Sequence, residues 1–263
     1  MTRRQGLLAA LLLAVAGCGG NPPPAPREQA TPAPTTAAAH RCGETSVRAE
    51  PISFRTSDGF TLAGAVTGSG PVGAVLIHEY PLDYCGWLPY AGYLARHGVR
   101  ALAFDLRCFA ASACPAGRGH AVTDVAAAMA ELRRRGARKT VLVGASMGGS
   151  IAVVAGARLR PAAIVDLSGE RDTTGLTAGI HADAGSAARG VTAPALFAVA
   201  RGDRYVTVAD MHTVARRARS PSKRVIVLPA VAGHGWAMLS GTAREWTPLA
   251  ATVAAFIRRH GGG

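Results

Sequence analysis

The stretch that decides the fold of this chain is Val141-Leu-Val-Gly-Ala-Ser146-Met-Gly-Gly-Ser150. A short apolar run, typical of a buried strand, leads into the pattern Gly-x-Ser-x-Gly, and an apolar helical pattern follows. Such a turn needs small residues, because the backbone of its serine is strained and the strand and helix pack closely around it. The five-residue pattern is weak by itself. Its position between a buried strand and a helix predicts that Ser146 is a nucleophile rather than a bystander in a tight turn.

Short, almost entirely apolar runs recur on both sides of this turn, at 73–78, 99–104, 140–144, 162–166, 195–199 and 224–228. Continuous rather than alternating apolar runs are what parallel strands buried on both faces require. Helical patterns separate them, at 87–97, 124–135, 147–159, 207–219 and 243–260, and we expect Thr123 to cap the second of these. Upstream, two alternating segments flank the turn Ser57-Asp58-Gly59. The sequence therefore predicts an α/β fold, with an N-terminal β-hairpin and a mostly parallel central sheet flanked by helices.

A carboxylate and a histidine, both much later in the chain than Ser146, complete the pattern of a hydrolytic triad. A serine is a poor nucleophile until a base takes its proton, so a carboxylate and a histidine should follow it in that order. Asp203 follows the apolar run 195–199, and His234 follows the run 224–228. We predict that Asp203 orients the imidazole of His234, which acts on Ser146 as base and then as acid. The rival carboxylates are Asp105, Asp166 and Asp172.

With these motifs, residues 46–260 resemble the α/β-hydrolase family, most closely small uncapped members such as dienelactone hydrolases and bacterial carboxylesterases. The interval between Asp166 and Ala195, where capped members carry a helical lid, has room for a loop and one short helix. The resemblance implies an oxyanion hole formed by the backbone N–H groups of Tyr80, in the loop after run 73–78, and Met147, directly after the nucleophile.

The sequence departs from the family pattern in two loops. Glu79 stands where glycine is usual, so its carboxylate points outwards, binds a polar group of the substrate, or weakens the activity. Cys108 and Ala110 occupy the glycine positions of the family's Asp-x-Arg-Gly-x-Gly loop. A disulfide in this second loop would stiffen the mouth of the site.

The N-terminus has the features of a lipoprotein signal peptide over residues 1–17. Arg3 and Arg4 precede an apolar run that is too short to span a bilayer, and Val15-Ala-Gly-Cys18 resembles the lipobox of bacterial lipoproteins. An ordinary signal peptide with an incidental cysteine is the alternative. We expect a lipid on Cys18, a Pro/Ala/Thr-rich tether over 18–45 and a hydrolase domain over 46–263. This arrangement predicts a protein anchored on the extracytoplasmic face of the cell membrane.

The predicted export of the protein also predicts the oxidation state of the remaining cysteines. The chain has five, and assigning Cys18 to lipid leaves Cys42, Cys85, Cys108 and Cys114. An even number in an oxidising compartment predicts two disulfides. Three pairings are open, of which we favour Cys108–Cys114 with Cys42–Cys85.

Composition excludes several classes of function. The formal net charge is +13, but the arginines are scattered and only 5% of residues are aromatic, which argues against nucleic-acid binding. The spacing typical of a zinc site, a phosphate loop or a dinucleotide fingerprint is missing from the sequence, so we expect no metal or cofactor. The favoured function is hydrolysis of small or exposed carboxylic esters through an acyl-serine, by a monomer. The alternatives are dienelactone or thioester hydrolysis on the same triad, and an inactive envelope-anchored binding protein. Arginines docking on anionic envelope polymers would be compatible with any of these.

Overall fold

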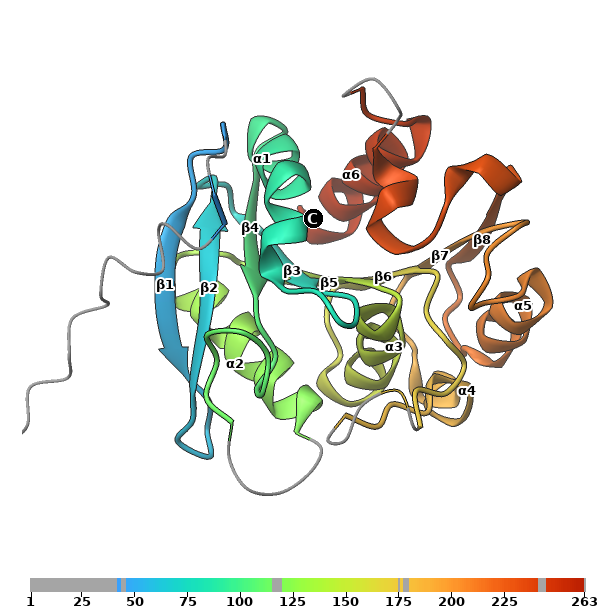
Figure 1. The fold of residues 1–263 in the computed structure, drawn as a ribbon, viewed down its shortest axis with the longest axis horizontal. Helices are drawn as coiled ribbons and strands as arrows, with labels where there is room; N and C mark the ends of the chain where they lie inside the picture. Colours follow the sequence, from blue (N-terminus) through green and yellow to red (C-terminus); the bar gives the residue numbers. More distant parts are fainter. Residues whose placement is uncertain are drawn as a thin grey trace, which may run out of the picture. The chain divides into compact units, whose positions relative to one another are not determined.

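The computed structural model describes residues 42–43, 46–114, 120–174, 176, 180–240 and 245–262. These residues form an eight-stranded sheet in the order β1-β2-β4-β3-β5-β6-β7-β8 (Figure 1). The strands are β1 (Glu50–Arg55), β2 (Thr61–Thr67), β3 (Val72–Ile77), β4 (Val99–Phe104), β5 (Lys139–Ala145), β6 (Ala163–Leu167), β7 (Ala195–Ala200) and β8 (Lys223–Leu228). The predicted α/β fold class is confirmed.

The two kinds of strand pairing follow the two kinds of sequence pattern. β1 and β2 form the predicted antiparallel hairpin, and β2 also pairs antiparallel with β4. All later neighbours in the sheet are parallel. Every residue of β3 is buried, as its uninterrupted apolar run predicts, whereas buried and exposed residues alternate along most of β1.

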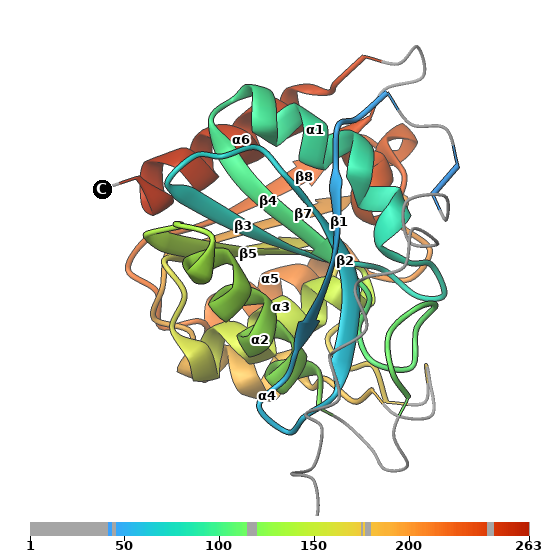
Figure 2. The same cartoon turned by 90° about the vertical axis from the view of Figure 1, so that its left-hand side faces the viewer.

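Helices cover both faces of the sheet (Figures 1 and 2). They are α1 (Leu88–Arg96), α2 (Ala121–Arg134), α3 (Met147–Leu159), α4 (Ala184–Ala187), α5 (Val208–Arg217) and α6 (Pro248–Gly261). One buried cluster joins the sheet to α2, α3 and α5, and a second joins its other face to α1 and α6. Burial of these two apolar faces is the main stabilising contribution to the fold.

Two helix boundaries differ from the sequence prediction. α2 begins at Ala121, so Thr123 lies inside the helix and does not cap it. The reason is tertiary, because Asp124 in the first turn is fully buried and accepts hydrogen bonds from Arg107. α6 begins at Pro248 rather than near 243, since proline is suited to the first turn of a helix.

The interval between β6 and β7 carries no large cap in the part of it that the structure describes. It contains α4 and a short 3₁₀ helix (Ala188–Gly190). The disulfides are Cys42–Cys85 and Cys108–Cys114, the pairing favoured from the sequence. Among the described residues, no helix has the length and apolar character needed to cross a membrane. The predicted signal peptide, the lipidation site Cys18 and nearly all of the tether lie outside the described residues.

Candidate active site

Ser146 lies on a strained turn between β5 and α3. Its φ of 50° and ψ of −123° are unfavourable for a residue with a side chain, and its N–H donates to the carbonyl of Leu167 at 2.9 Å. A Cβ at Gly144 would collide with the backbone of Gly148. The Gly-x-Ser-x-Gly pattern is therefore required by close backbone approach, as the sequence predicts for a nucleophile elbow.

The two predicted oxyanion donors lie in neighbouring segments. A Cβ at Gly148 would collide with the carbonyl oxygen of Ile77, so the first turn of α3 packs directly against the loop after β3. Tyr80 belongs to that loop and Met147 is the first residue of α3. Neither N–H donates a hydrogen bond to another described residue. Both groups are thus available to a ligand oxygen, and their role as an oxyanion hole stays a prediction.

Asp203 and His234 come together at the ends of β7 and β8. Nδ1 of His234 lies 2.9 Å from Oδ1 and 2.8 Å from Oδ2 of Asp203. The carboxylate is fully buried and also accepts from the N–H groups of Tyr205 and Val206, at 2.9 and 3.2 Å. These contacts fix both the carboxylate and the imidazole, which leaves Nε2 of His234 as the nitrogen able to act on a substrate.

The charges of this pair are mutually stabilised. Burial by itself would raise the pKa of Asp203, but its hydrogen bonds from His234 and from the N–H of Tyr205 hold that pKa below the ordinary value. Burial would likewise lower the pKa of His234, but the hydrogen bond to Asp203 and its negative charge raise it above the ordinary value. The imidazole is therefore a stronger base than a free histidine.

Aromatic rings hold the loop that carries His234. The ring of Tyr205 lies 4.8 Å from the imidazole, centroid to centroid, and is 72% exposed. Trp236 packs edge-on against Trp87 at 5.5 Å and fills the space beside Gly86, where a Cβ would collide with its ring. Core contacts of Trp236 thus fix the His234 loop on one side, and its other side, next to Tyr205, faces solvent.

The hydroxyl of Ser146 has a partner that the sequence analysis missed. Its Oγ donates to Oε1 of Glu170 at 2.9 Å, and the hydroxyl of the neighbouring Ser150 donates to the backbone carbonyl of Glu170 at 2.7 Å. No hydrogen bond joins Ser146 to His234 among the described residues. A usable signal was present, because Glu170 follows β6 closely and ligands gather where parallel strands end.

Glu79 points inwards, so the expectation that its carboxylate could face outwards is wrong. Its Oε2 lies 3.4 Å from the N–H of Trp236, and a Cβ at Gly235 would collide with the same oxygen. Burial raises the pKa of Glu79 to about 7, and the charge of Glu170 adds to this rise. A second carboxyl group therefore borders the site, and its charged form is disfavoured relative to that of a free glutamate.

The rival carboxylates accept hydrogen bonds from loop residues and not from the imidazole of His234. Asp105 accepts from the N–H of Tyr84 at 3.0 Å. Asp166 is fully buried beside the elbow, accepts from the N–H of Gly169 at 2.6 Å, and has its pKa raised to about 7 by burial. Asp172 accepts from Thr174. None of the three hydrogen-bonds to His234 among the described residues.

The second departing loop keeps the backbone conformation of glycine without the glycines. Cys108 and Ala110 have φ of 65° and 42°, and the Cys108–Cys114 disulfide closes the loop. Phe109 between them packs edge-on against His78 at 4.6 Å and against Tyr80 at 6.3 Å. The buried imidazole of His78 in turn accepts from the N–H of Leu106 at 3.2 Å. These contacts tie the loop after β4 to the loop that carries Tyr80.

A hollow of about 270 Å³ lies beside the predicted triad. It is lined by Glu170, Arg171, Asp172, Tyr205, Val206 and Asp210. It thus joins the partner of Ser146 to the ring that covers His234. The described residues hold no group of three or more His, Cys, Asp or Glu side chains placed to bind a metal ion. The chemistry that this site offers is a hydroxyl, an oriented imidazole and free backbone N–H groups.

Solved structures that superimpose on this chain identify its fold. An esterase of Pyrococcus furiosus, Pf2001, superimposes with a TM-score of 0.69 at 18% identity, covering 82% of this chain and 91% of its own. A thermophilic esterase from Thermogutta terrifontis gives 0.65 at 20% identity, covering 81% and 99%. The α/β hydrolase GrgF from Penicillium gives 0.69 at 16% identity, covering 82% and 100%. This chain has the α/β-hydrolase fold. No family model matches the sequence, and no curated protein matches it.

Proposed function

We propose that this α/β-hydrolase-fold protein is a serine hydrolase that cleaves carboxylic esters through an acyl-serine intermediate. The observation that carries the proposal is the contact of His234 with the buried carboxylate of Asp203, 2.8 Å away, at the same sheet edge as the strained Ser146. A serine on a strained turn and an oriented imidazole at the same sheet edge are groups that acyl transfer requires. The esterase neighbours support a hydrolase at the level of fold.

The reaction needs one rearrangement of the serine. The hydroxyl of Ser146 turns from Glu170 to Nε2 of His234, which takes its proton as the oxygen attacks the ester carbonyl. The carbonyl oxygen becomes an oxyanion, whose binding we assign to the N–H groups of Tyr80 and Met147. His234 then gives its proton to the alkoxy oxygen as the bond between that oxygen and the carbonyl carbon breaks, which releases the alcohol and leaves an acyl-serine. A water molecule, deprotonated by His234, attacks the acyl carbon, and the bond to Oγ breaks as the proton returns to Ser146 and the acid leaves.

The surroundings of Ser146 favour uncharged or cationic substrates. Glu170 contacts the nucleophile, Glu79 lies beside Gly235 in the His234 loop, and Asp172 and Asp210 line the adjoining hollow with Arg171. A negatively charged ester would be repelled by these carboxylates. The hollow is also small and the site carries no large described cap, which supports small or exposed esters over long acyl chains.

The test is hydrolysis of p-nitrophenyl acetate by the wild type and by Ser146→Ala. We expect kcat to fall by about 10⁴-fold or more in the variant, because the nucleophile is removed. Ser150→Ala is the matched control, since Ser150 also contacts Glu170 but lies one turn into α3. Equal activity of the wild type and Ser146→Ala would refute the proposal.

One observation favours an inactive binding protein as the second candidate. Ser146 is hydrogen-bonded to Glu170 and not to the imidazole, so its hydroxyl is not poised for deprotonation in this conformation. A fluorophosphonate probe separates the candidates, because only an activated serine reacts with it. Labelling of the wild type and none of Ser146→Ala is expected for the hydrolase. Absence of labelling in both would favour the binding protein.

We further propose that the protein is a lipoprotein anchored through Cys18. The support is the sequence pattern around residue 18, since two or three acyl chains give stable anchoring where one does not. Cell fractionation of the wild type and Cys18→Ser, with mass spectrometry of the N-terminal peptide, tests it. Loss of the lipid mass in the variant is expected. A wild-type peptide without lipid would rule the anchor out.

A further inference from the structure

A second charged region lies at the opposite end of the sheet from Ser146. β5 connects the two, because Lys139 is its first residue and Ser146 follows its last. At about 3.3 Å per residue the strand separates them by roughly 20 Å. The strands β3 to β8 are parallel, so their first residues gather at one end and the predicted triad at the other.

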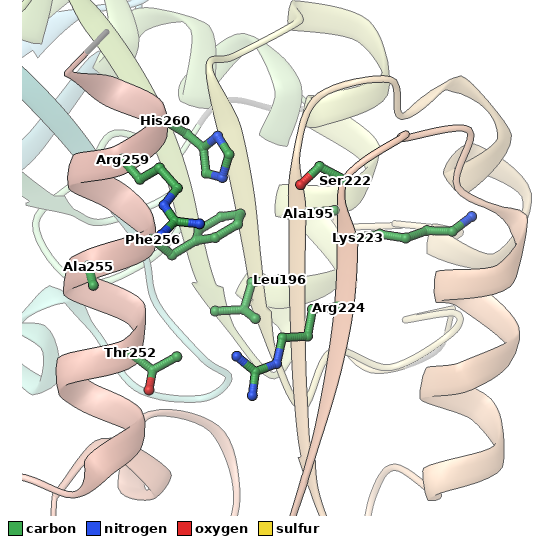
Figure 3. Close-up of a pocket in the computed structure, with 10 residues that line it drawn as sticks. All are labelled: Ala195, Leu196, Ser222, Lys223, Arg224, Thr252, Ala255, Phe256, Arg259 and His260. Atoms are coloured by element: carbon green, nitrogen blue, oxygen red, sulfur yellow. The ribbon is translucent and has the colours of Figure 1, made fainter.

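Figure 3 shows a hollow at this end, between α6 and the first residues of β7 and β8. Its volume is about 390 Å³. Arg259 from α6 and Arg224 from β8 reach into the gap from its two sides, with the ring of Phe256 between α6 and the strands (Figure 3). Lys223 lies at the rim and donates to the carbonyl of Ala218. No acidic residue lines this hollow.

A second basic hollow adjoins the first through a shared residue, His260. Its cations come from the end of α2, the turn before β5, the start of β5 and the end of α3, and they are Arg133, Arg138, Lys139 and Arg160. No acidic residue lines this hollow either. We call the cations of the two hollows, these four with Lys223, Arg224 and Arg259, the basic end.

The cations of the basic end are exposed and unneutralised. All are solvent-exposed, and none forms a salt bridge with an acidic residue in the described part of the chain. Some other arginines do form ion pairs: Arg107 contacts Asp58 and Asp124, and Arg135, which follows α2, contacts Glu50 and Glu131. The basic end therefore presents seven exposed cations that no described carboxylate pairs with.

Helix-end electrostatics does not account for this placement. A cation in the last turn of a helix, such as Arg133 in α2, stabilises the helix dipole. Lys139 and Arg224, however, lie in strands, and Arg138 lies in a turn before one. These residues share a position at one end of the sheet. A common binding surface would explain that position, whereas stabilisation of a helix dipole would not.

We propose that the basic end is a docking surface for an anionic lipid bilayer. The cations are spread over the ends of several elements, so they suit a plane of laterally mobile phosphate headgroups better than one compact ligand. Phe256 adds an aromatic ring among the cations. Docking by this end leaves the opposite end of the sheet, where Ser146 follows β5, facing away from the membrane. The proposal stands whether or not the hydrolase activity does.

The test is co-sedimentation of the full chain, carrying Cys18→Ser so that no lipid contributes, with vesicles of phosphatidylcholine alone or with phosphatidylglycerol. Residues 1–17, with Arg3 and Arg4, are the same in every variant, so a change between variants in the ratio of the two affinities reports the substituted charges. We expect a preference for anionic vesicles that falls about 25-fold in Arg224→Gln/Arg259→Gln, at about fivefold per cation. Raising the salt to 0.5 M should abolish it.

The matched control is Arg48→Gln/Arg55→Gln, which removes the same charge from exposed positions in and before β1. It should keep the anionic preference. Equal loss in both variants would reduce the effect to net charge and overturn the proposal, as would an unchanged preference in Arg224→Gln/Arg259→Gln. Tighter binding to soluble polyphosphate than to vesicles of the same charge concentration would assign the surface to an anionic polymer instead. Circular dichroism of each variant verifies that it is folded.

Discussion

The two ends of the parallel sheet differ in backbone strain. At the carboxyl end the backbone is strained: Cys108, Ala110, Ser146 and Ser168 all have positive φ. At the amino end, Arg160 is the one described non-glycine residue with positive φ. Side chains that must meet in a fixed geometry need turns that orient them. A surface that binds a charged membrane needs only that its cations be exposed. Strain is therefore found where chemistry is proposed.

The ends also differ in how they treat charge. Carboxyl groups at the carboxyl end are buried and hydrogen-bonded, as Asp166, Asp203 and Glu79 show, and their pKa values are shifted. Cations at the amino end are exposed and unpaired. A buried charge depends on its neighbours for its protonation state, but an exposed one is screened by water and salt. Substitutions at the two ends should therefore have effects of different size and different pH dependence.

The largest effect is expected for Asp203→Asn. Loss of the charge that orients and stabilises the imidazole should lower kcat for p-nitrophenyl acetate by about 10³- to 10⁴-fold. Asp203 raises the pKa of His234, and activity is lost as pH falls through that pKa, so the acidic limb of the pH profile should move to lower pH. Asp183→Asn is the control, because asparagine also caps α4. Unchanged kcat in Asp203→Asn would contradict its assignment.

A smaller effect, in the opposite direction, is expected for Glu170→Gln. To reach His234, the hydroxyl of Ser146 must break a hydrogen bond to a charged acceptor in the wild type and to a neutral acceptor in the variant. The free-energy cost of breaking it is about 1 kcal/mol lower in the variant. We expect kcat/KM for a neutral ester to rise about fivefold. Glu170→Asp separates contact from charge, since it withdraws the acceptor and keeps the carboxylate. A tenfold fall in Glu170→Gln would instead indicate that Glu170 assists the reaction.

The smallest effect concerns stability, and it compares Asp166 near the carboxyl end of β6 with Lys139 at the amino end of β5. Burial raises the pKa of Asp166 from 3.8 to about 7, so the folded state binds a proton that the unfolded state loses between these values. Stability from this group is present below pH 3.8 and is lost as pH rises through about 7. Asp166→Asn should therefore raise Tm by several degrees at pH 8 and change it little near pH 4. Lys139→Gln, exposed at the other end, should leave Tm within about 2 °C at both. A shift in Asp166→Asn that is equal at both pH values would contradict the buried charge.

Much of the fold was predictable because local patterns and global structure agree. The uninterrupted apolar runs locate the parallel strands, and the glycines of the elbow locate the turn at Ser146. Where the prediction was wrong, a distant residue decided: Asp124 is drawn into the core by Arg107, which places it in a helix that starts before Thr123. No periodicity within 121–134 carries that information.

The sequence by itself determined the fold class, the order Ser146, Asp203, His234 and the edge of the sheet where they gather. These depend on the chain's own backbone preferences, which spacing and residue type reveal. Only the tertiary structure decided which atoms meet: that the hydroxyl of Ser146 donates to Glu170, that Glu79 turns inwards beside Trp236, and that scattered arginines converge on one end. Such contacts join residues far apart in the chain, and their geometry is set by the packing of whole strands and helices.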